Sequence, residues 1–176
     1  MAIAFDAASS SSSSGTTALT LAHTCTGTDR ALVVTASCPN STDYLATATV
    51  TYAAVSMGSP RVSTVSGSSL TQYTWVLANP ASGTNNIVVT PSGSAHLCVI
   101  GASFTGVDQT TPVDATNSSN NSFATSPYST SISVSAGGVA VDACAERVLT
   151  GTFANDGSQT AVTSNTANSV SRMGAS

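Results

Sequence analysis

Residues Leu97–Asp114 have the sequence LCVIGASFTGVDQTTPVD, and this stretch decides the fold class. Its first part, Leu97–Phe104, is a short run in which apolar residues fall on both alternating faces. Such a run is typical of a strand that is covered on both sides in the middle of a packed sheet. Thr105-Gly106 ends the run, and Thr111-Pro112 closes the polar loop that follows.

The rest of the chain contains shorter and more polar strand patterns around this run. They recur about every 8–12 residues with turn residues between them, which is typical of a β-sandwich or barrel. Helical periodicity of useful length is absent. We therefore predict an all-β fold, an antiparallel two-sheet sandwich that is jelly-roll-like. The other expected strands are Thr17–Cys25, Arg30–Cys38, Ala46–Tyr52, Arg61–Val65, Leu70–Leu77, Asn85–Thr90, Phe123–Thr125, Ser129–Val134, Gly138–Ala145, Gln159–Ser164 and Ser169–Met173.

Three turns are predicted from their residue types. Thr26–Asp29 contains glycine and is expected to join Thr17–Cys25 and Arg30–Cys38 into a hairpin. Ala53-Ala54 is expected to be a tight turn, and Ala136-Gly137-Gly138 a hairpin turn.

The N-terminal segment differs in composition from the remainder. Ala2–Asp6 is a short apolar run that predicts a first strand or an arm. Ala7–Gly15 contains six consecutive serines and predicts a flexible linker or loop. We therefore expect residues 1–16 to be an N-terminal strand or arm with a serine-rich linker, and residues 17–176 to be the sandwich. The start lacks the basic and apolar regions of a signal peptide, which predicts a protein kept in the cytosol until it is released.

Charge is scarce along the whole chain. Charged residues make up 7% of the sequence, lysine is absent and the net charge is −4. This balance excludes nucleic-acid binding, which needs clustered basic residues, and an electrostatic membrane anchor. It favours association, because an uncharged surface repels its neighbours weakly.

The cysteines Cys25, Cys38, Cys98 and Cys144 lie in or beside apolar runs without metal-site spacing. We interpret them mainly as small buried hydrophobic residues. One or two disulfides are the alternative, and the sequence does not select a pairing.

Two aspartates flank the loop after the central run. Asp108 and Asp114 are interpreted mainly as turn-capping residues. The alternative is a calcium site, because calcium binds several oxygen ligands from loops of this kind. No other metal site and no cofactor are expected.

Four further residues are candidates for chemistry. His23 and His96 are interpreted as core or edge histidines, since the sequence lacks a nucleophile-elbow motif that would give them a catalytic partner. Tyr73 and Trp75 share one strand face and are interpreted as core, with a sugar-stacking platform as the alternative. We predict no catalytic residues and no enzymatic activity.

Four segments together resemble a β-sandwich domain found in phage virion proteins and bacterial surface proteins. They are the opening Ile3–Ser14, YAAVSM at Tyr52–Met57, WVLANPASGTNNIVVT at Trp75–Thr90 and GASFTGVDQTTPVD at Gly101–Asp114. The chain departs from this family at its end, where an aromatic-containing closing hairpin is expected and SRMGAS at Ser171–Ser176 stands instead. An open sheet edge there would be a template for strand addition by another chain.

The resemblance implies a structural virion protein of a bacteriophage, either a capsid decoration protein or a tail-appendage subunit. Its partners would be copies of itself and other virion proteins, with no nucleic acid and no membrane. The protein would be assembled in the host cytoplasm and reside in the virion. The alternative is an extracellular adhesin or carbohydrate-binding module with a glycan as its partner.

Overall fold

The computed structural model describes residues 2–66, 70–119, 131–146, 160–166 and 170–175. These ranges contain twelve strands and no helix, so no helix in them is long and apolar enough to cross a membrane. The strands are β1 (Ala4–Thr16), β2 (Leu19–Cys25), β3 (Ala31–Cys38), β4 (Thr49–Tyr52), β5 (Val55–Ser56), β6 (Val62–Ser66), β7 (Leu70–Ala78), β8 (Gly83–Thr90), β9 (Ala95–Thr105), β10 (Val141–Glu146), β11 (Thr160–Thr166) and β12 (Val170–Ala175).

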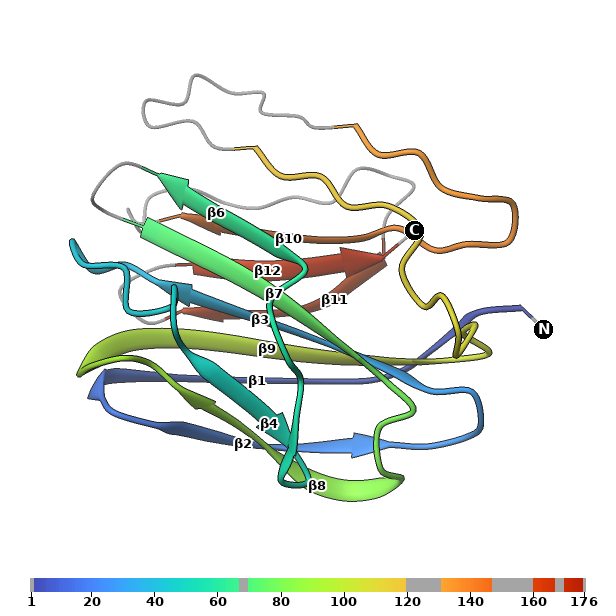
Figure 1. Ribbon diagram of the computed structural model, residues 1–176, viewed down its shortest axis with the longest axis horizontal. Coiled ribbons are helices and arrows are strands. Elements are labelled where there is room, and N and C mark those ends of the chain that lie inside the picture. Colours follow the sequence, from blue (N-terminus) through green and yellow to red (C-terminus); the bar gives the residue numbers. More distant parts are fainter. Residues whose placement is uncertain (1, 67–69, 120–130, 147–159, 167–169, 176) are drawn as a thin grey trace.

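The strands form three antiparallel sheets in layers (Figure 1). Sheet A has the order β1-β9-β3-β7-β6, and sheet B has the order β2-β8-β4-β5. Sheet C is smaller, with the order β10-β12-β11, and its strands contact β1, β9 and β7 of sheet A. Sheet A is therefore the middle layer, with sheet B on its inner face and sheet C on its outer face.

The pairing in sheets A and B is nested. β4 pairs with β5, β3 with β7, β2 with β8 and β1 with β9, and successive pairs lie in alternate sheets. A long two-stranded ribbon folded over in this way is a jelly roll. The predicted all-β, antiparallel, jelly-roll-like sandwich is confirmed.

The central strands are buried on both faces, as the apolar run predicts. Every residue of β3 is buried, and so are the residues of β9 from Leu97 to Phe104. Alternate residues of these strands face the core between sheets A and B, which includes Leu32, Val34 and Trp75. Their other faces form a second cluster on the outer side of sheet A, which includes Val33 and Phe104. A strand with two packed faces needs apolar residues at every position, which explains the sequence of both strands.

The prediction that Ala7–Gly15 is a flexible linker is wrong. The serine run lies within β1, which pairs antiparallel with β9 from Ala4↔Thr105 to Thr16↔Ala95. The ladder satisfies backbone groups of β9 that would otherwise be buried without partners, and this outweighs the weak strand preference of a polar run.

Two other local predictions are also corrected. Thr17–Cys25 and Arg30–Cys38 do not form a hairpin, because β2 lies in sheet B and β3 in sheet A. The turn between them, with Gly27 at φ 70° and Asp29 at φ 50°, carries the chain from one sheet to the other. The described part of Ser129–Val134, residues 131–134, has no strand structure, and Phe123–Thr125 lies outside the described residues.

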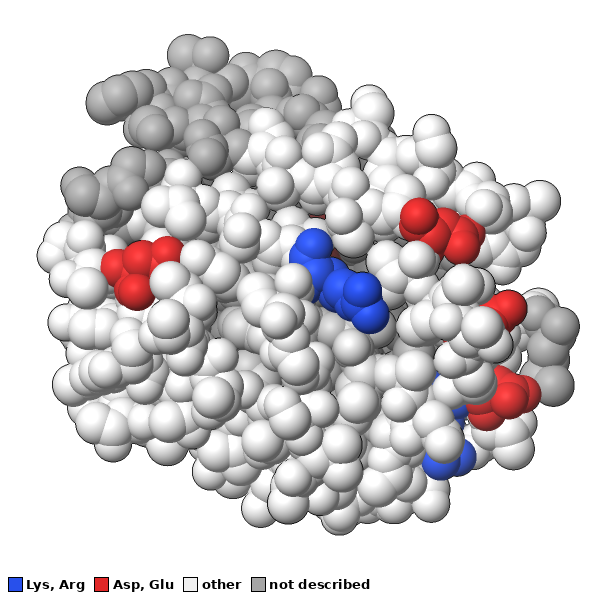
Figure 2. All heavy atoms as spheres, viewed as in Figure 1, with Lys and Arg blue, Asp and Glu red and all other residues white. Residues whose placement is uncertain are grey.

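The last two predicted strands are confirmed as β11 and β12. Their pairing with β10 in a third sheet was not predicted. None of the four cysteines forms a disulfide in the structure, so the disulfide alternative is not borne out. Cys25, Cys38 and Cys98 are buried, as expected for small hydrophobic residues. Figure 2 shows one face of the molecule, on which the charged side chains are few and scattered.

Candidate functional site

The loop that follows the central strand closes a pocket on the outer face of sheet A. The pocket has a volume of about 880 Å³. Its walls are the loop from Gly106 to Asn117 and the segment 132–141, which returns toward β10. Such a volume is typical of pockets that bind small molecules or peptide segments.

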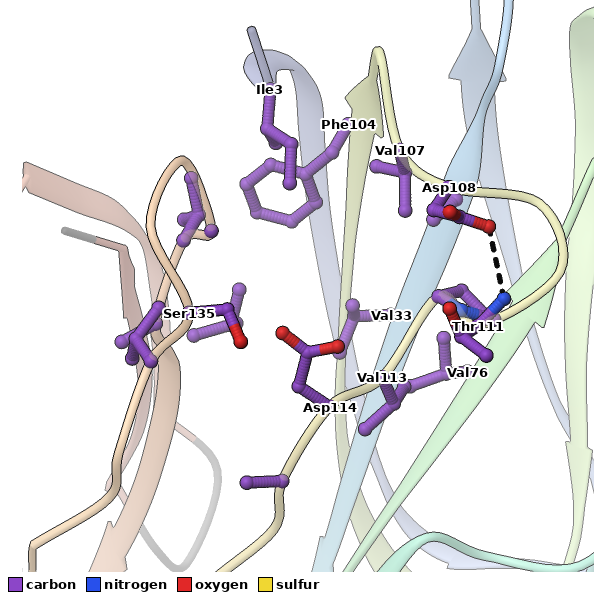
Figure 3. A pocket seen from close by; sticks show the side chains of 18 of the residues that line it. Ile3, Val33, Val76, Phe104, Val107, Asp108, Thr111, Val113, Asp114 and Ser135 are labelled. Atoms are coloured by element: carbon purple, nitrogen blue, oxygen red, sulfur yellow. Dashed lines mark hydrogen bonds between the residues drawn. The ribbon is translucent and has the colours of Figure 1, made fainter. Parts of the chain in front are cut away.

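The floor of the pocket is apolar. Val33 of β3, Val76 of β7 and Phe104 of β9 line it, together with Val107 at the start of the loop (Figure 3). These side chains belong to the second hydrophobic cluster, so the floor is fixed by the packing of sheet A itself.

Asp108 caps the turn of the loop. Its Oδ1 accepts hydrogen bonds from the backbone N–H groups of Thr110 and Thr111, at 2.7 and 3.0 Å. These two bonds hold the pKa of Asp108 below its ordinary value, and the bond from Thr111 has the larger effect. The turn-capping interpretation is confirmed for this residue.

Asp114 lies across the same pocket. It is exposed, and its carboxylate points into the pocket toward the segment that contains Ser135 (Figure 3). The structure therefore brings Asp108 and Asp114 to one pocket, but turns the carboxylate of Asp108 to the loop backbone. No group of three or more histidine, cysteine or acidic residues that could hold a metal is found in the described part of the chain. A calcium site at Asp108 and Asp114 stays a prediction.

Two more charged residues complete the rim. Asp29, in the turn before β3, and Arg61, before β6, also line the pocket. The rim thus carries three carboxylates and one guanidinium above an apolar floor. The sequence pattern did not reveal this set, because Asp29 and Arg61 come from turns far from the loop in sequence.

The two histidines lie elsewhere. Neither His23 nor His96 lines the pocket, so no histidine joins the two aspartates there. His23 is buried between sheets A and B, 2% exposed, and its Nδ1 lies 2.8 Å from the hydroxyl of Ser9. Burial lowers the pKa of His23, and the charge of Asp6 offsets part of that effect. The core interpretation is confirmed for this histidine.

Asp6 of β1 lies near His23 and forms a hydrogen-bonded cluster with Thr26 and Ser103. It accepts hydrogen bonds from the backbone and hydroxyl of Thr26 and from the hydroxyl of Ser103. Burial pushes the pKa of Asp6 upward, but these hydrogen bonds together outweigh it and hold the pKa below its ordinary value. The cluster joins β1 to β9 and to the turn after β2, so its evident role is to fix the N-terminal strand.

The aromatic pair is in the core. Tyr73 and Trp75 stack with ring centroids 6.0 Å apart and an interplanar angle of 27°. Trp75 is 0% exposed, so its ring offers no face to a sugar. Tyr73 donates its hydroxyl hydrogen to Asp43 Oδ2 at 2.8 Å, and burial and this bond raise its pKa to about 12. The interpretation of Tyr73 and Trp75 as core residues is confirmed.

The comparisons with known proteins identify no relative of this chain: no protein-family model, curated protein or solved structure matches it.

Proposed function

We propose that this chain is a structural subunit of a bacteriophage particle, either a capsid decoration protein or a tail-appendage subunit. The observation that carries the proposal is a jelly-roll sandwich whose surface has almost no charge. Jelly rolls recur in viral capsid and lectin domains. The sequence resemblance to phage virion domains points in the same direction.

The outer face of sheet B supports contact with other proteins. Its exposed residues are small and uncharged. Threonines even pair across its strands, as the hydroxyls of Thr24 and Thr84 lie 2.8 Å apart. Burying such a face costs little desolvation, since it carries no ions. The exposed residues of this face are Thr20, Ala22, Thr49, Ser56, Thr84, Asn86 and Thr90.

The sheet edges support the same proposal. β1, a 13-residue strand with one acidic residue and no lysine or proline, lies at the edge of sheet A. Exposed edge strands in monomeric proteins are usually blunted by charges, prolines or bulges. β1 has two irregularities near its ends and a regular stretch between them, which leaves this edge suited to a neighbouring subunit.

A carbohydrate-binding module has less support. Its candidate platform, Tyr73 and Trp75, is buried, and among the described residues that line the pocket Phe104 is the one aromatic residue. A glycan array probed with the purified protein separates the two functions, because a structural subunit gives no saturable glycan binding.

The test is association with particles. An antibody against the purified protein should detect it in phage particles banded on a density gradient from lysates of cells that carry the gene. Recombinant protein should also bind stripped particles at a fixed copy number. Finding the chain only in the soluble fraction, with no saturable binding to particles, would contradict the proposal.

A pair of variants can locate the contact. Thr20→Lys with Asn86→Lys places two charges on the outer face of sheet B, and Ser59→Lys places one on an exposed loop as the control. If the face is the contact, the double variant should bind particles at least about tenfold more weakly, equivalent to about 1.4 kcal/mol. The control should bind like the native chain.

A further inference from the structure

The pocket on the outer face of sheet A, named the groove from here on, is bounded on one side by a segment that lies outside the three sheets. One wall is the segment 131–138, which is exposed throughout and forms no ladder with β10. Its Ile132 and Val134 alternate with serines, line the pocket and are each 45% exposed. Two large apolar side chains on the rim of an apolar pocket mark a surface that another group can cover.

The backbone along this wall belongs to no strand of the described part of the chain, although the carbonyl of Ser131 accepts a hydrogen bond from the side chain of Asn117 at 2.6 Å. A turn at Ala136-Gly137, closed by the bond from Gly138 N–H to the carbonyl of Ser135 at 2.8 Å, joins the segment to the start of β10. Residues 131–135 and 138–140 thus lie on the two sides of the turn, and neither pairs as a strand with any described residue. An added strand could pair with these backbones, which is the common way in which sheets bind extended peptides.

The charge of the rim selects a basic occupant. Among the described lining residues, Asp29, Asp108 and Asp114 are acidic and Arg61 is basic. The carboxylate of Asp108 is held by the loop backbone, and that of Asp114 is directed into the groove (Figure 3). A lysine or arginine on the bound segment would complement this charge, whereas an acidic residue would be repelled.

This chain is a poor source of such a segment. It has no lysine and four arginines. Arg30 donates to the carbonyls of Pro80 and Gly27, and Arg61 is part of the rim itself. Arg172 lies in β12, which is paired on both sides by β10 and β11, and Arg147 lies outside the described residues. The absence of lysine and the places of the three described arginines favour a different protein as the source.

We propose that the groove binds an extended segment of another protein, with apolar residues that alternate along it and one basic side chain. The apolar side chains rest on Val33, Val76 and Phe104, the backbone pairs with the segments beside the turn, and the basic group meets Asp114. The inference goes beyond the proposed function, because it names the chemistry of the partner segment and does not need a phage particle.

The test uses a defined peptide. The probe is a capped peptide of about seven residues in which valine alternates with threonine and lysine replaces the central threonine. Titration is followed by amide chemical shifts of the ¹⁵N-labelled protein. We expect saturable binding, with shifts at Val33, Val76 and Ile132. The same peptide with central glutamate should bind several-fold more weakly, and a copy with N-methylated valines should not bind, because it cannot pair as a strand.

Protein variants test the groove directly. Asp114→Asn should weaken binding of the lysine peptide about two- to five-fold, the range of an exposed ion pair, and salt at about 1 M should remove that difference. Asp142→Asn, an exposed aspartate that does not line the pocket, is the matched control and should leave binding unchanged. Ile132→Ser with Val134→Ser should weaken binding of every peptide, since it removes apolar cover.

Three results would overturn the inference. They are no saturable binding of the lysine peptide, equal binding of the lysine and glutamate peptides, and equal binding of the N-methylated copy. None of them bears on particle association, which is measured separately, so failure of the groove and failure of the proposed function are distinguishable.

Discussion

Ser9 and His23 connect the N-terminal strand to the core: the Ser9 hydroxyl lies 2.8 Å from Nδ1 of a histidine that is only 2% exposed. The histidine belongs to β2 in sheet B and the serine to β1 in sheet A, so this contact bridges the two sheets. Its energetics depend on the protonation of His23.

Acidification should weaken the fold through His23. Burial lowers its pKa in the folded state, so the unfolded chain binds a proton first as the pH falls below about 6.5. Stability should therefore be independent of this residue above that pH and fall below it, by no more than about 1.4 kcal/mol per pH unit. Urea unfolding at pH 7 and pH 5 measures the difference. His23→Gln should remove most of it, and His96→Gln should not.

A second loss of stability should follow at lower pH through Asp6. Its pKa is lowered in the folded state, so its contribution is present above the unfolded pKa of about 3.9 and is lost as the pH falls through the folded value. Asp6→Asn should flatten the unfolding profile below pH 4. The slope between pH 7 and pH 5 should persist or steepen slightly, because loss of the Asp6 charge lowers the pKa of His23 further. Equal flattening in both windows would contradict the assignment to separate groups.

The serine run should behave as a strand, not as a linker. Ser11 faces Val99 and Ser12 faces Cys98 in a regular antiparallel ladder, in which neighbouring residues direct their N–H groups to opposite sides. Proline removes that hydrogen bond. Of the variants Ser11→Pro and Ser12→Pro, the one whose N–H points toward β9 should lower the free energy of unfolding by about 2–3 kcal/mol. The one whose N–H points away from β9 should lower it clearly less. Two near-neutral variants would contradict the strand.

The sequence predicted the sandwich because its two central strands have no polar face. In an eight-residue strand such as β3 every residue is buried, and the resulting run of mainly apolar residues can be recognised in the sequence. β1 left no such pattern, because Ser9–Ser13 are held by the backbone ladder with β9, a partner about ninety residues away in sequence. Pairing between distant segments overrides local preference.

The site was predicted in part for a similar reason. The turn-capping role of Asp108 depends on Thr110 and Thr111, which follow it directly, so it was visible in the sequence. The groove depends on Asp29 and Arg61, which only the folded topology brings to the rim with Asp114. Ile132 and Val134 alternate with serines as in a strand. This alternation does not reveal that residues 131–135 pair with no strand in the described part of the chain.

A substitution in the turn between β4 and β5 should raise the free energy of unfolding. Ala53 and Ala54 both have positive φ, 49° and 63°, which costs a non-glycine residue about 1–2 kcal/mol. Ala54→Gly relieves this strain and loses about 0.4–1 kcal/mol to the greater freedom of the unfolded chain. The net gain should be about 0.5–1 kcal/mol, seen in urea unfolding. Ala81→Gly, at an exposed alanine without positive φ, is the control and should not stabilise.

Gly101 should be coupled to Ile87 across the core. A Cβ at Gly101 would lie 2.6 Å from Ile87 Cδ1, and it would also approach Nδ1 of His23 at 3.5 Å. Gly101→Ala should cost about 1–3 kcal/mol through overpacking, and Ile87→Val about 0.5–1.5 kcal/mol through a lost methyl group. Because the valine lacks Cδ1, the double variant should be more stable than the sum of the two single losses, by about 1 kcal/mol. Urea unfolding of the native chain, the two single variants and the double variant measures this coupling as a double-mutant cycle. Additive losses would mean that the glycine is needed for the space occupied by Ser9 and His23, and that Ile87 simply moves aside.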